Sequence, residues 1–178
     1  MRIASAALLA AALAAPLAHA QTPATPSPAP APVPEVMPFD IPYGAPIGID
    51  IAQKAIAAAA AEAKKHNWKM AISVVDPAGN LVAHATMDGT QYASIPIAQA
   101  KARTAALFRR PSGAFQATVN GGSPSGLSLL ALVGGAASEG GFPIVVDGKL
   151  IGAIGASGGI FTQDAATAKA GLEVAGGK

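Results

Sequence analysis

The chain has 178 residues, and its 12 Lys and Arg nearly balance its 10 Asp and Glu, so the total charge makes no case for nucleic-acid or membrane-surface binding. The absence of cysteine excludes disulfides, cysteine-based zinc sites and thiol nucleophiles. Aromatic residues make up only 4% of the chain, which argues against a stacking platform for single-stranded nucleic acid.

Residues 1–20 have the pattern of a secretory signal peptide. Arg2 is followed by an apolar run, Ile3 to Leu17, and then by small residues before an expected cut after Ala20. The alternative is a membrane anchor, but the run is short for a span and ends at a cleavage-like site. We therefore expect a secreted or periplasmic protein with no stable membrane insertion once the signal peptide is removed.

Residues 21–45 form a segment rich in proline and alanine. Between Pro23 and Pro34, proline recurs every second or third residue, which fixes φ and removes amide donors. Such a segment is neither helix nor sheet, and it predicts an extended, solvated linker. The remaining residues, 46–178, have the usual size of one folded domain.

The domain is predicted to begin with a helix and a β-hairpin. Residues 50–65 are rich in strong helix formers and end in basic residues, which suit a helix C-terminus. Residues 68–76 alternate as a strand, the sequence DPAGN turns the chain, and residues 80–87 form the return strand. His84 falls on the more polar face of that strand, where we expect solvent, a ligand or a partner.

A second helix is expected from Ser94 to about Arg109, with Pro111 ending it. Its predicted apolar stripe consists of Ile97, Ala100, Thr104 and Leu107. Residues 121–141 are rich in glycine and serine and predict a long loop that contains a short strand or turn.

A second hairpin and a last helix complete the domain. Residues 142–146 and 149–156 are expected to pair across Asp147-Gly148, a strong two-residue hairpin signal. Thr162 is the expected cap of a helix that runs to about Ala175. Hairpins pair antiparallel, so the order of elements predicts an α+β fold, with an antiparallel sheet of about five strands flanked by helices.

Gly152 and Gly155 lie inside the predicted last strand, where turn chemistry does not explain them. The stretch GAIGASGG lacks the lysine of a phosphate-binding P-loop and the strand-then-helix setting of a dinucleotide fingerprint. Glycine within a strand lets another backbone or a flat ligand come close. These two glycines therefore indicate either tight packing or the wall of a binding pocket.

A group of basic residues and one histidine are further candidates. The basic residues are Lys101, Arg103, Arg109 and Arg110, with no acidic residue between Asp88 and Glu139. Lys101 or Arg103 could hold a carboxylate or phosphate, although a solvated helix face is the simpler explanation of the charges.

His84 is the candidate for a metal-binding role, either as an axial ligand of haem iron or as a general base. The alternative is an ordinary polar surface residue. The other conceivable iron ligands are Met70, Met87, Tyr43 and Tyr92.

Four blocks occur in order along the chain: VVDPAGNLVAHATMDG, SIPIAQAKARTAALFRRPS, GGFPIVVDGKLIGAIGASGG and QDAATAKAGL. Together they resemble the GlcG/HbpS-like family of haem-binding and haem-degrading proteins, over residues 45–172. The resemblance implies a profilin-like fold, a haem cofactor and assembly into homo-oligomers. It also places Asp88, Lys101, Arg103 and residues 152–159 in the family's shared core, and it implies an aromatic or aliphatic residue where this chain has His84.

The resemblance implies a protein of the haem-binding type that takes part in haem handling or oxidative-stress sensing, and the predicted signal peptide implies that it is exported. The basic residues without acidic neighbours and the strand glycines lead us to expect a small, flat, anionic ligand. Two alternatives stay open. One is an oligomerising structural domain without a small ligand, and the other is a haem-degrading or redox enzyme. The residues themselves do not decide whether the protein is an enzyme.

Overall fold

The computed structural model describes residues 32–122 and 124–177. The chain divides into two units, residues 1–35 and 36–178, and the helices and strands that the structure describes lie in the second unit. The predicted signal peptide and most of the predicted linker lie outside the described residues. No helix in the described part of the chain is both long enough and apolar enough to cross a membrane.

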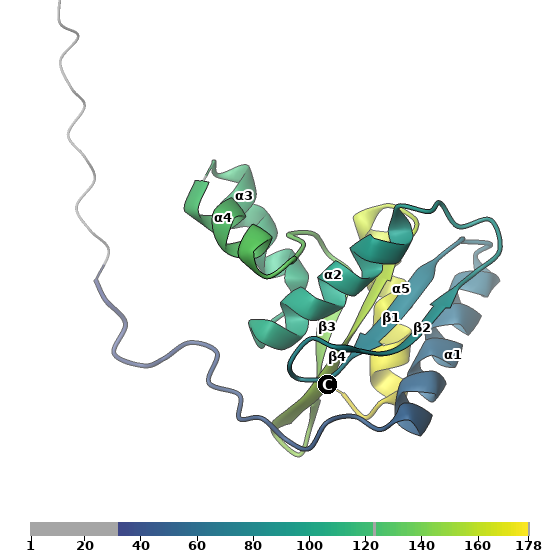
Figure 1. Ribbon diagram of the computed structural model, residues 1–178, viewed down its shortest axis with the longest axis horizontal. Helices are drawn as coiled ribbons and strands as arrows, with labels where there is room; N and C mark the ends of the chain where they lie inside the picture. The colour runs from purple at the N-terminus through teal and green to yellow at the C-terminus, as the bar shows by residue number, and fades with distance from the viewer. Residues whose placement is uncertain (1–31, 123, 178) are drawn as a thin grey trace, which may run out of the picture. The chain divides into compact units, whose positions relative to one another are not determined.

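Two hairpins form one antiparallel sheet, with the strand order β2-β1-β4-β3 (Figure 1). The strands are β1 (Ala71–Val75), β2 (Leu81–Thr86), β3 (Gly141–Val146) and β4 (Lys149–Ser157). The outer strands are β2 and β3, because the two hairpins join through the pairing of β1 with β4. Both predicted hairpins and the α+β class are therefore confirmed.

The sheet has four strands rather than about five. The segment before the first helix approaches a fifth strand, because Tyr43 forms an isolated parallel bridge with Leu150 of β4. Gly44 and Ile47 donate backbone hydrogen bonds to β4, but Pro42 and Pro46 have no N–H to donate. The pairing therefore stops at one bridge.

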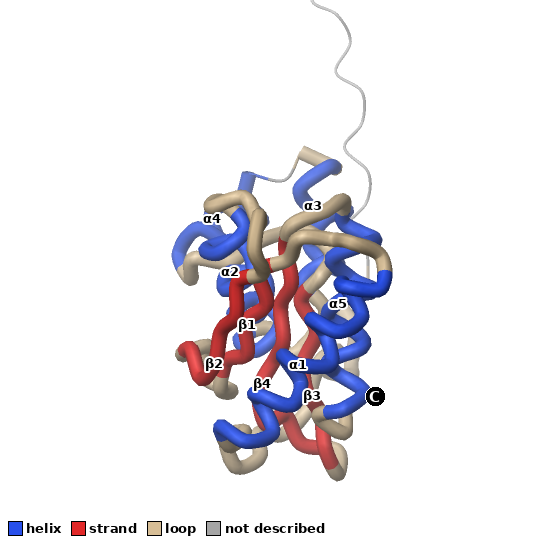
Figure 2. Tube along the Cα trace, turned by 90° about the vertical axis from the view of Figure 1, so that its right-hand side faces the viewer, coloured by secondary structure: helices blue, strands red, loops and turns tan. Residues whose placement is uncertain are grey.

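Helices cover both faces of the sheet. Helices α1 (Ile49–Lys65) and α5 (Phe161–Val174) pack together on one face, and α2 (Ser94–Leu107) packs on the other (Figures 1 and 2). Strand β1 is central, so all five of its residues are buried. Ile72 and Val74 join the core beneath α1 and α5, whereas Val75 joins the smaller core beneath α2.

The buried stripe of α2 differs from the predicted one. Ile97 is 38% exposed, and the side chains that face the sheet are small, with Lys101 as the one long exception. The buried residues of the helix are Ser94, Ala98, Lys101, Ala102, Thr104, Ala105 and Ala106. Only Thr104 belongs to both stripes, because the close approach of α2 to glycines in β3 and β4 admits alanine and excludes isoleucine.

The region predicted as a long loop contains a helix rather than a short strand or turn. A short 3₁₀ turn (Ser112–Phe115) and α3 (Gln116–Asn120) precede α4 (Pro124–Leu132), which lies inside residues 121–141. Glycine and serine in this segment lower helix propensity, but four leucines and a proline at the first position support α4. The last helix begins at Phe161, with Ile160 rather than Thr162 at its N-cap.

Candidate functional site

Four residues form one row across the sheet on the face that α2 covers. Gly141 of β3 pairs with Gly155 of β4, which pairs with Ser73 of β1, which pairs with His84 of β2. A Cβ on Gly155 would overlap the backbone of Ala98, and a Cβ on Gly141 would likewise overlap α2. The helix thus lies directly on the two glycines and leaves the His84 end of the row uncovered.

At the two predicted strand glycines, other parts of the chain occupy the space that a side chain would take. Gly155 lies against the backbone of α2, as described above. A Cβ on Gly152 would be 2.5 Å from the carbonyl oxygen of Val75 and 2.9 Å from Cγ2 of Ile47. The packing alternative therefore accounts for both glycines without a ligand.

His84 has a hydrogen-bond partner on each ring nitrogen. Nδ1 lies 2.8 Å from the Ser73 hydroxyl, and Nε2 lies 2.8 Å from the Thr86 hydroxyl. Partial burial lowers the pKa of His84 below its ordinary value, because burial disfavours the charged imidazolium. His84 is therefore a neutral, oriented side chain at the open edge of the sheet.

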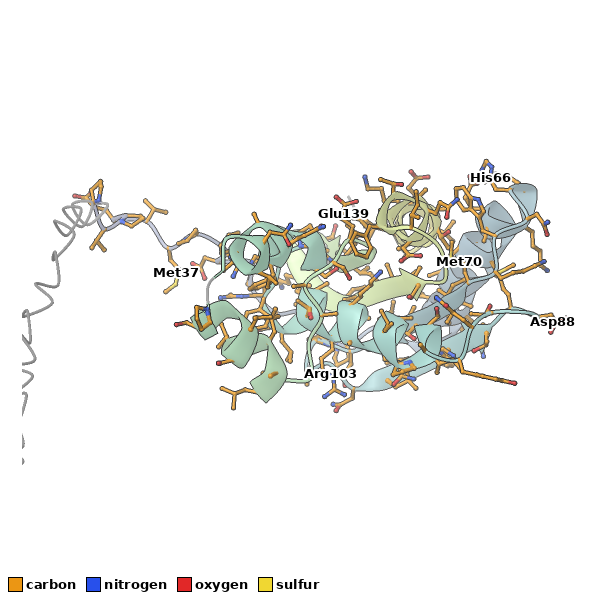
Figure 3. All side chains as sticks on the ribbon, turned by 90° about the horizontal axis from the view of Figure 1, so that it is seen from above. Met37, His66, Met70, Asp88, Arg103 and Glu139 are labelled. Atoms are coloured by element: carbon orange, nitrogen blue, oxygen red, sulfur yellow. The ribbon has the colours of Figure 1, made fainter. Side chains whose placement is uncertain are left out.

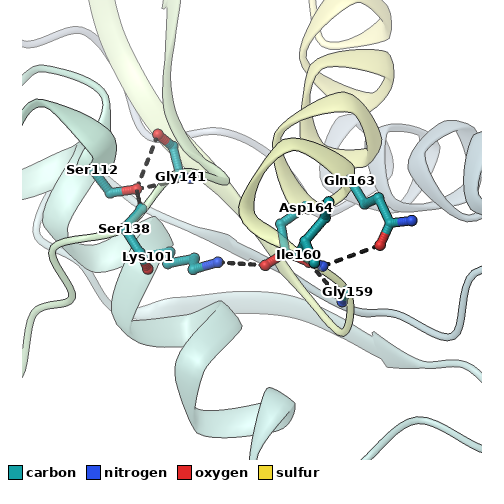
Figure 4. Close-up of polar contacts among 8 residues, drawn as sticks. All are labelled: Lys101, Ser112, Ser138, Gly141, Gly159, Ile160, Gln163 and Asp164. Carbon is teal, nitrogen blue, oxygen red and sulfur yellow. Dashed lines mark hydrogen bonds and ion pairs between the residues drawn. The ribbon is translucent and has the colours of Figure 1, made fainter. Parts of the chain in front are cut away.

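Lys101 is buried in an ion pair rather than directed to a pocket. Its Nζ donates to Oδ2 of Asp164 at 2.7 Å, and the two side chains are 1% and 2% exposed (Figure 4). Oδ1 of Asp164 accepts the Gly159 N–H at 3.0 Å. Burial raises the pKa of Asp164, and the bonds from Lys101 and Gly159 oppose that shift. The positive charge of Lys101 is thus already balanced.

Of the other three basic residues of the predicted cluster, Arg109 and Arg110 contact the chain's own segment at residues 39–43, and Arg103 does not. Nη1 of Arg109 donates to the carbonyl of Ile41 at 3.0 Å, and the Arg110 guanidinium lies 4.2 Å from the centre of the Phe39 ring. Arg103 is exposed, and within the described ranges it makes no ion pair or hydrogen bond. The cluster therefore does not converge on one ligand.

Two hollows lie at the end of the sheet where β1 begins and β2 and β4 end, and both are lined by Lys69. Each has a cavity volume of about 390 Å³. The Trp68 hollow is lined by Trp68, Lys69, Gly89, Gln91, Gly158, Gly159 and Gln163. The Met87 hollow is lined by Ala60, Lys64, Lys69, Ala85, Thr86, Met87 and Asp88. Of the predicted site residues, Asp88 lines a hollow, and His84 contacts one through Thr86.

These hollows combine cations with flat or soft apolar groups. Lys64 and Lys69 are exposed, and Lys69 donates to the side chain of Asn67 at 2.9 Å. Trp68 stacks on His66 with ring centres 4.3 Å apart. Figure 3 shows His66 and Asp88 at the same end of the domain, away from Glu139. Sequence analysis missed Lys64, Lys69 and Trp68, although Trp68 is the single tryptophan of the chain.

No group of three His, Asp or Glu side chains that could hold a metal ion occurs among the residues the structure describes. A metal ion bound by these residues would therefore be part of a larger cofactor, or would have few ligands from the protein.

Comparisons with known proteins place the chain in a family. The model of a family described as haem degrading protein HbpS-like matches residues 47–173. Protein GlcG of Escherichia coli K12 is 43% identical over 107 residues, which cover 60% of this chain and 78% of GlcG.

Two solved structures share the fold. HbpS of Streptomyces reticuli, solved as a double mutant, has a TM-score of 0.67 at 27% identity, covering 83% of this chain and 98% of HbpS. PduOC, solved as a complex with haem, has a TM-score of 0.67 at 25% identity, covering 72% of this chain and 94% of PduOC. The chain described here belongs to the HbpS-like family of haem degrading proteins.

Proposed function

We propose that the domain binds haem, a flat and anionic ligand, at the sheet end where the Trp68 and Met87 hollows share Lys69. The observation that carries the proposal is this shared lysine between two neighbouring hollows of about 390 Å³ each. Ligand pockets are typically about 300–1,000 Å³, so each hollow alone is at the lower end and the two together suit a larger ligand. The haem complex of PduOC supports the choice of ligand.

The residues present fit the chemistry of haem. Lys64 and Lys69 supply ammonium groups for its carboxylates. Trp68 offers an aromatic face to the macrocycle, and Gly89 leaves room for its flat surface, because a Cβ there would meet no atom nearer than 3.8 Å. Neither lysine is paired with an acidic side chain in the described part of the protein, so both charges are free to meet an anion.

Met87 is the side chain that we assign to the iron. It lines a hollow, and a thioether is an established haem ligand in proteins. His84 lines neither hollow, and both of its ring nitrogens already have partners. Bound haem would supply redox and oxygen chemistry. A role in oxidative-stress sensing would act through that group and not through a thiol, because the chain has no cysteine.

Haem titration of the purified chain without residues 1–20 tests the proposal. We expect a saturable shift of the Soret band, and a change in its position when Met87 is replaced by leucine. His84→Gln is the matched control and should leave the band position unchanged. A chain that gives no saturable shift would contradict haem binding, whereas a shift that depends on His84 alone would contradict the assignment of Met87.

We also propose that the protein forms homo-oligomers, and the exposed leucines of α4 support this second candidate. Leu127, Leu129 and Leu132 are 52%, 46% and 83% exposed. Exposed apolar side chains gathered on one short helix are typical of a protein interface. Light scattering should show an assembly that Leu129→Asp with Leu132→Asp reduces in mass. The matched control is Ile97→Asp on α2, and an unchanged mass in the α4 variant would contradict the proposal.

We further propose that the protein is exported and cut after Ala20. The basic start, the apolar run and the small residues before the cut support this. Mass spectrometry of the protein recovered from its native host should give an N-terminus at Gln21. An intact Met1 on the natively produced protein would contradict export by this route.

A further inference from the structure

We propose a second binding site, for a small zwitterion of the amino-acid class, in a hollow between Glu139 and Lys169. The hollow has a volume of about 230 Å³, and it shares no residue with the Trp68 or Met87 hollow. Its lining consists of Pro111, Gly113, Ala114, Glu139, Gly140, Phe142, Ala165 and Lys169. At that volume it is too small for a haem, since pockets for drug-sized ligands begin at about 300 Å³.

The wall that carries Glu139 is held rigidly by a buried hydroxyl. Ser112 is fully buried; its Oγ donates to the carbonyl of Ser138 at 2.5 Å and accepts the N–H of Gly141 at 2.9 Å (Figure 4). These two bonds fix the chain on both sides of Glu139. The stem of Glu139 packs on Gly113, where a Cβ would lie 2.8 Å from the Glu139 Cγ. The carboxylate is thus presented from a fixed backbone.

The opposite wall is fixed by the buried ion pair. Asp164 is bonded to Lys101 at the start of α5, and the next residue, Ala165, lines the hollow with Lys169 one turn later. Residues four apart lie on the same helix face, so Ala165 and Lys169 point to the same side. Gly140 separates the hollow from the ion pair, since a Cβ there would lie 3.2 Å from the Lys101 Nζ.

The charges of the two walls specify the ligand. Glu139 and Lys169 line the same hollow, yet they do not pair with each other, and in the described ranges neither makes any other ion pair. Lys169 Nζ instead lies 5.5 Å from the centre of the Phe142 ring. A simple anion would meet the carboxylate of Glu139, and a simple cation would meet Lys169. A ligand with both an ammonium and a carboxylate satisfies both walls.

The apolar residues that line the hollow indicate which side chain the ligand carries. Pro111, Ala114, Phe142 and Ala165 are apolar, so they suit an aliphatic side chain rather than a second charge. We therefore take L-leucine as the probe. Two analogues of leucine serve as single-charge controls. Isocaproate lacks the amine, and isoamylamine lacks the carboxylate.

NMR titration of the isotopically labelled chain with L-leucine tests the inference. We expect saturable shifts of the Gly113, Gly140 and Phe142 amides with L-leucine, and no saturable shift with isocaproate or isoamylamine. Glu139→Gln and Lys169→Gln should each weaken L-leucine binding about tenfold or more, because each removes a charge-assisted hydrogen bond.

The matched controls are Glu173→Gln on the same helix and Lys149→Gln on β4, which are exposed and line no part of this hollow. Both should bind L-leucine as the unaltered chain does. Absence of saturable shifts with L-leucine, equal binding of isocaproate, or equal weakening by the control variants would overturn the inference. None of these results depends on whether haem binds at the sheet end.

Discussion

Lys101 of α2 donates a hydrogen bond to Asp164 of α5 at 2.7 Å, and this buried ion pair joins the helices that cover opposite faces of the sheet. The Gly159 N–H completes the environment of the carboxylate. A buried carboxylate is tolerated only when it is paired and hydrogen-bonded, so the two side chains depend on each other.

Replacing Lys101 alone should destabilise the fold strongly. Lys101→Met removes the cation and leaves Asp164 buried without its partner, for which we expect a loss of about 3–5 kcal/mol in the free energy of unfolding. The double variant Lys101→Met with Asp164→Leu should recover much of that loss, because it removes both charges. Urea unfolding of the unaltered chain, Lys101→Met, Asp164→Leu and the double variant measures the coupling between the two side chains. Losses that simply add in the double variant would show that the pair is not coupled.

Gly155 should tolerate no side chain, because α2 lies on it. We expect Gly155→Ala to lower the free energy of unfolding by about 1–3 kcal/mol or more through overpacking against the backbone of α2. Gly48→Ser is the matched control, since nothing lies within 4 Å of its Cβ and serine suits the N-cap of α1. Thermal unfolding compares the two, and a stable Gly155→Ala chain would contradict the packing account.

Stability should depend on His84 in mildly acidic solution. Because burial lowers its pKa below 6.5, the folded state binds fewer protons than the unfolded chain in the window beneath that value. The contribution of His84 is therefore complete above pH 6.5 and is lost as the pH falls through the folded pKa.

Urea unfolding at a series of pH values measures this effect. The stability of the unaltered chain should fall more steeply below pH 6.5 than that of His84→Gln. Asp164 is present in both chains, so the difference between the two curves isolates His84. Parallel curves would show that His84 keeps its ordinary pKa in the folded protein.

The hairpins were predictable because their signals are local. The DPAGN turn and Asp147-Gly148 set their own backbone geometry, and Gly148 has a φ of +72°. The stripe of α2 was not predictable in the same way. The helical periodicity predicts that Ile97 is buried. The glycines beneath the helix lie far away in sequence, and their close contact with α2 admits alanine rather than isoleucine on the buried face.

The candidate site was only partly visible in the sequence. Asp88, a candidate binding residue from the sequence, lines the Met87 hollow. Lys69 lines both hollows only because the starts and ends of three strands meet there. Lys101 appeared to be a free cation because its partner, Asp164, is 63 residues away. Pairing over such a distance leaves no local pattern to read.

Haem titration of charge-reversed variants tests the central claim most directly. Lys64→Glu with Lys69→Glu alters the cations of the sheet-end hollows, whereas Arg103→Glu alters an exposed cation that lines neither of them. We predict that the double variant weakens haem binding about tenfold or more and that Arg103→Glu leaves the affinity unchanged. Unchanged haem affinity in the double variant, or equal weakening by Arg103→Glu, would contradict a haem site at the sheet end.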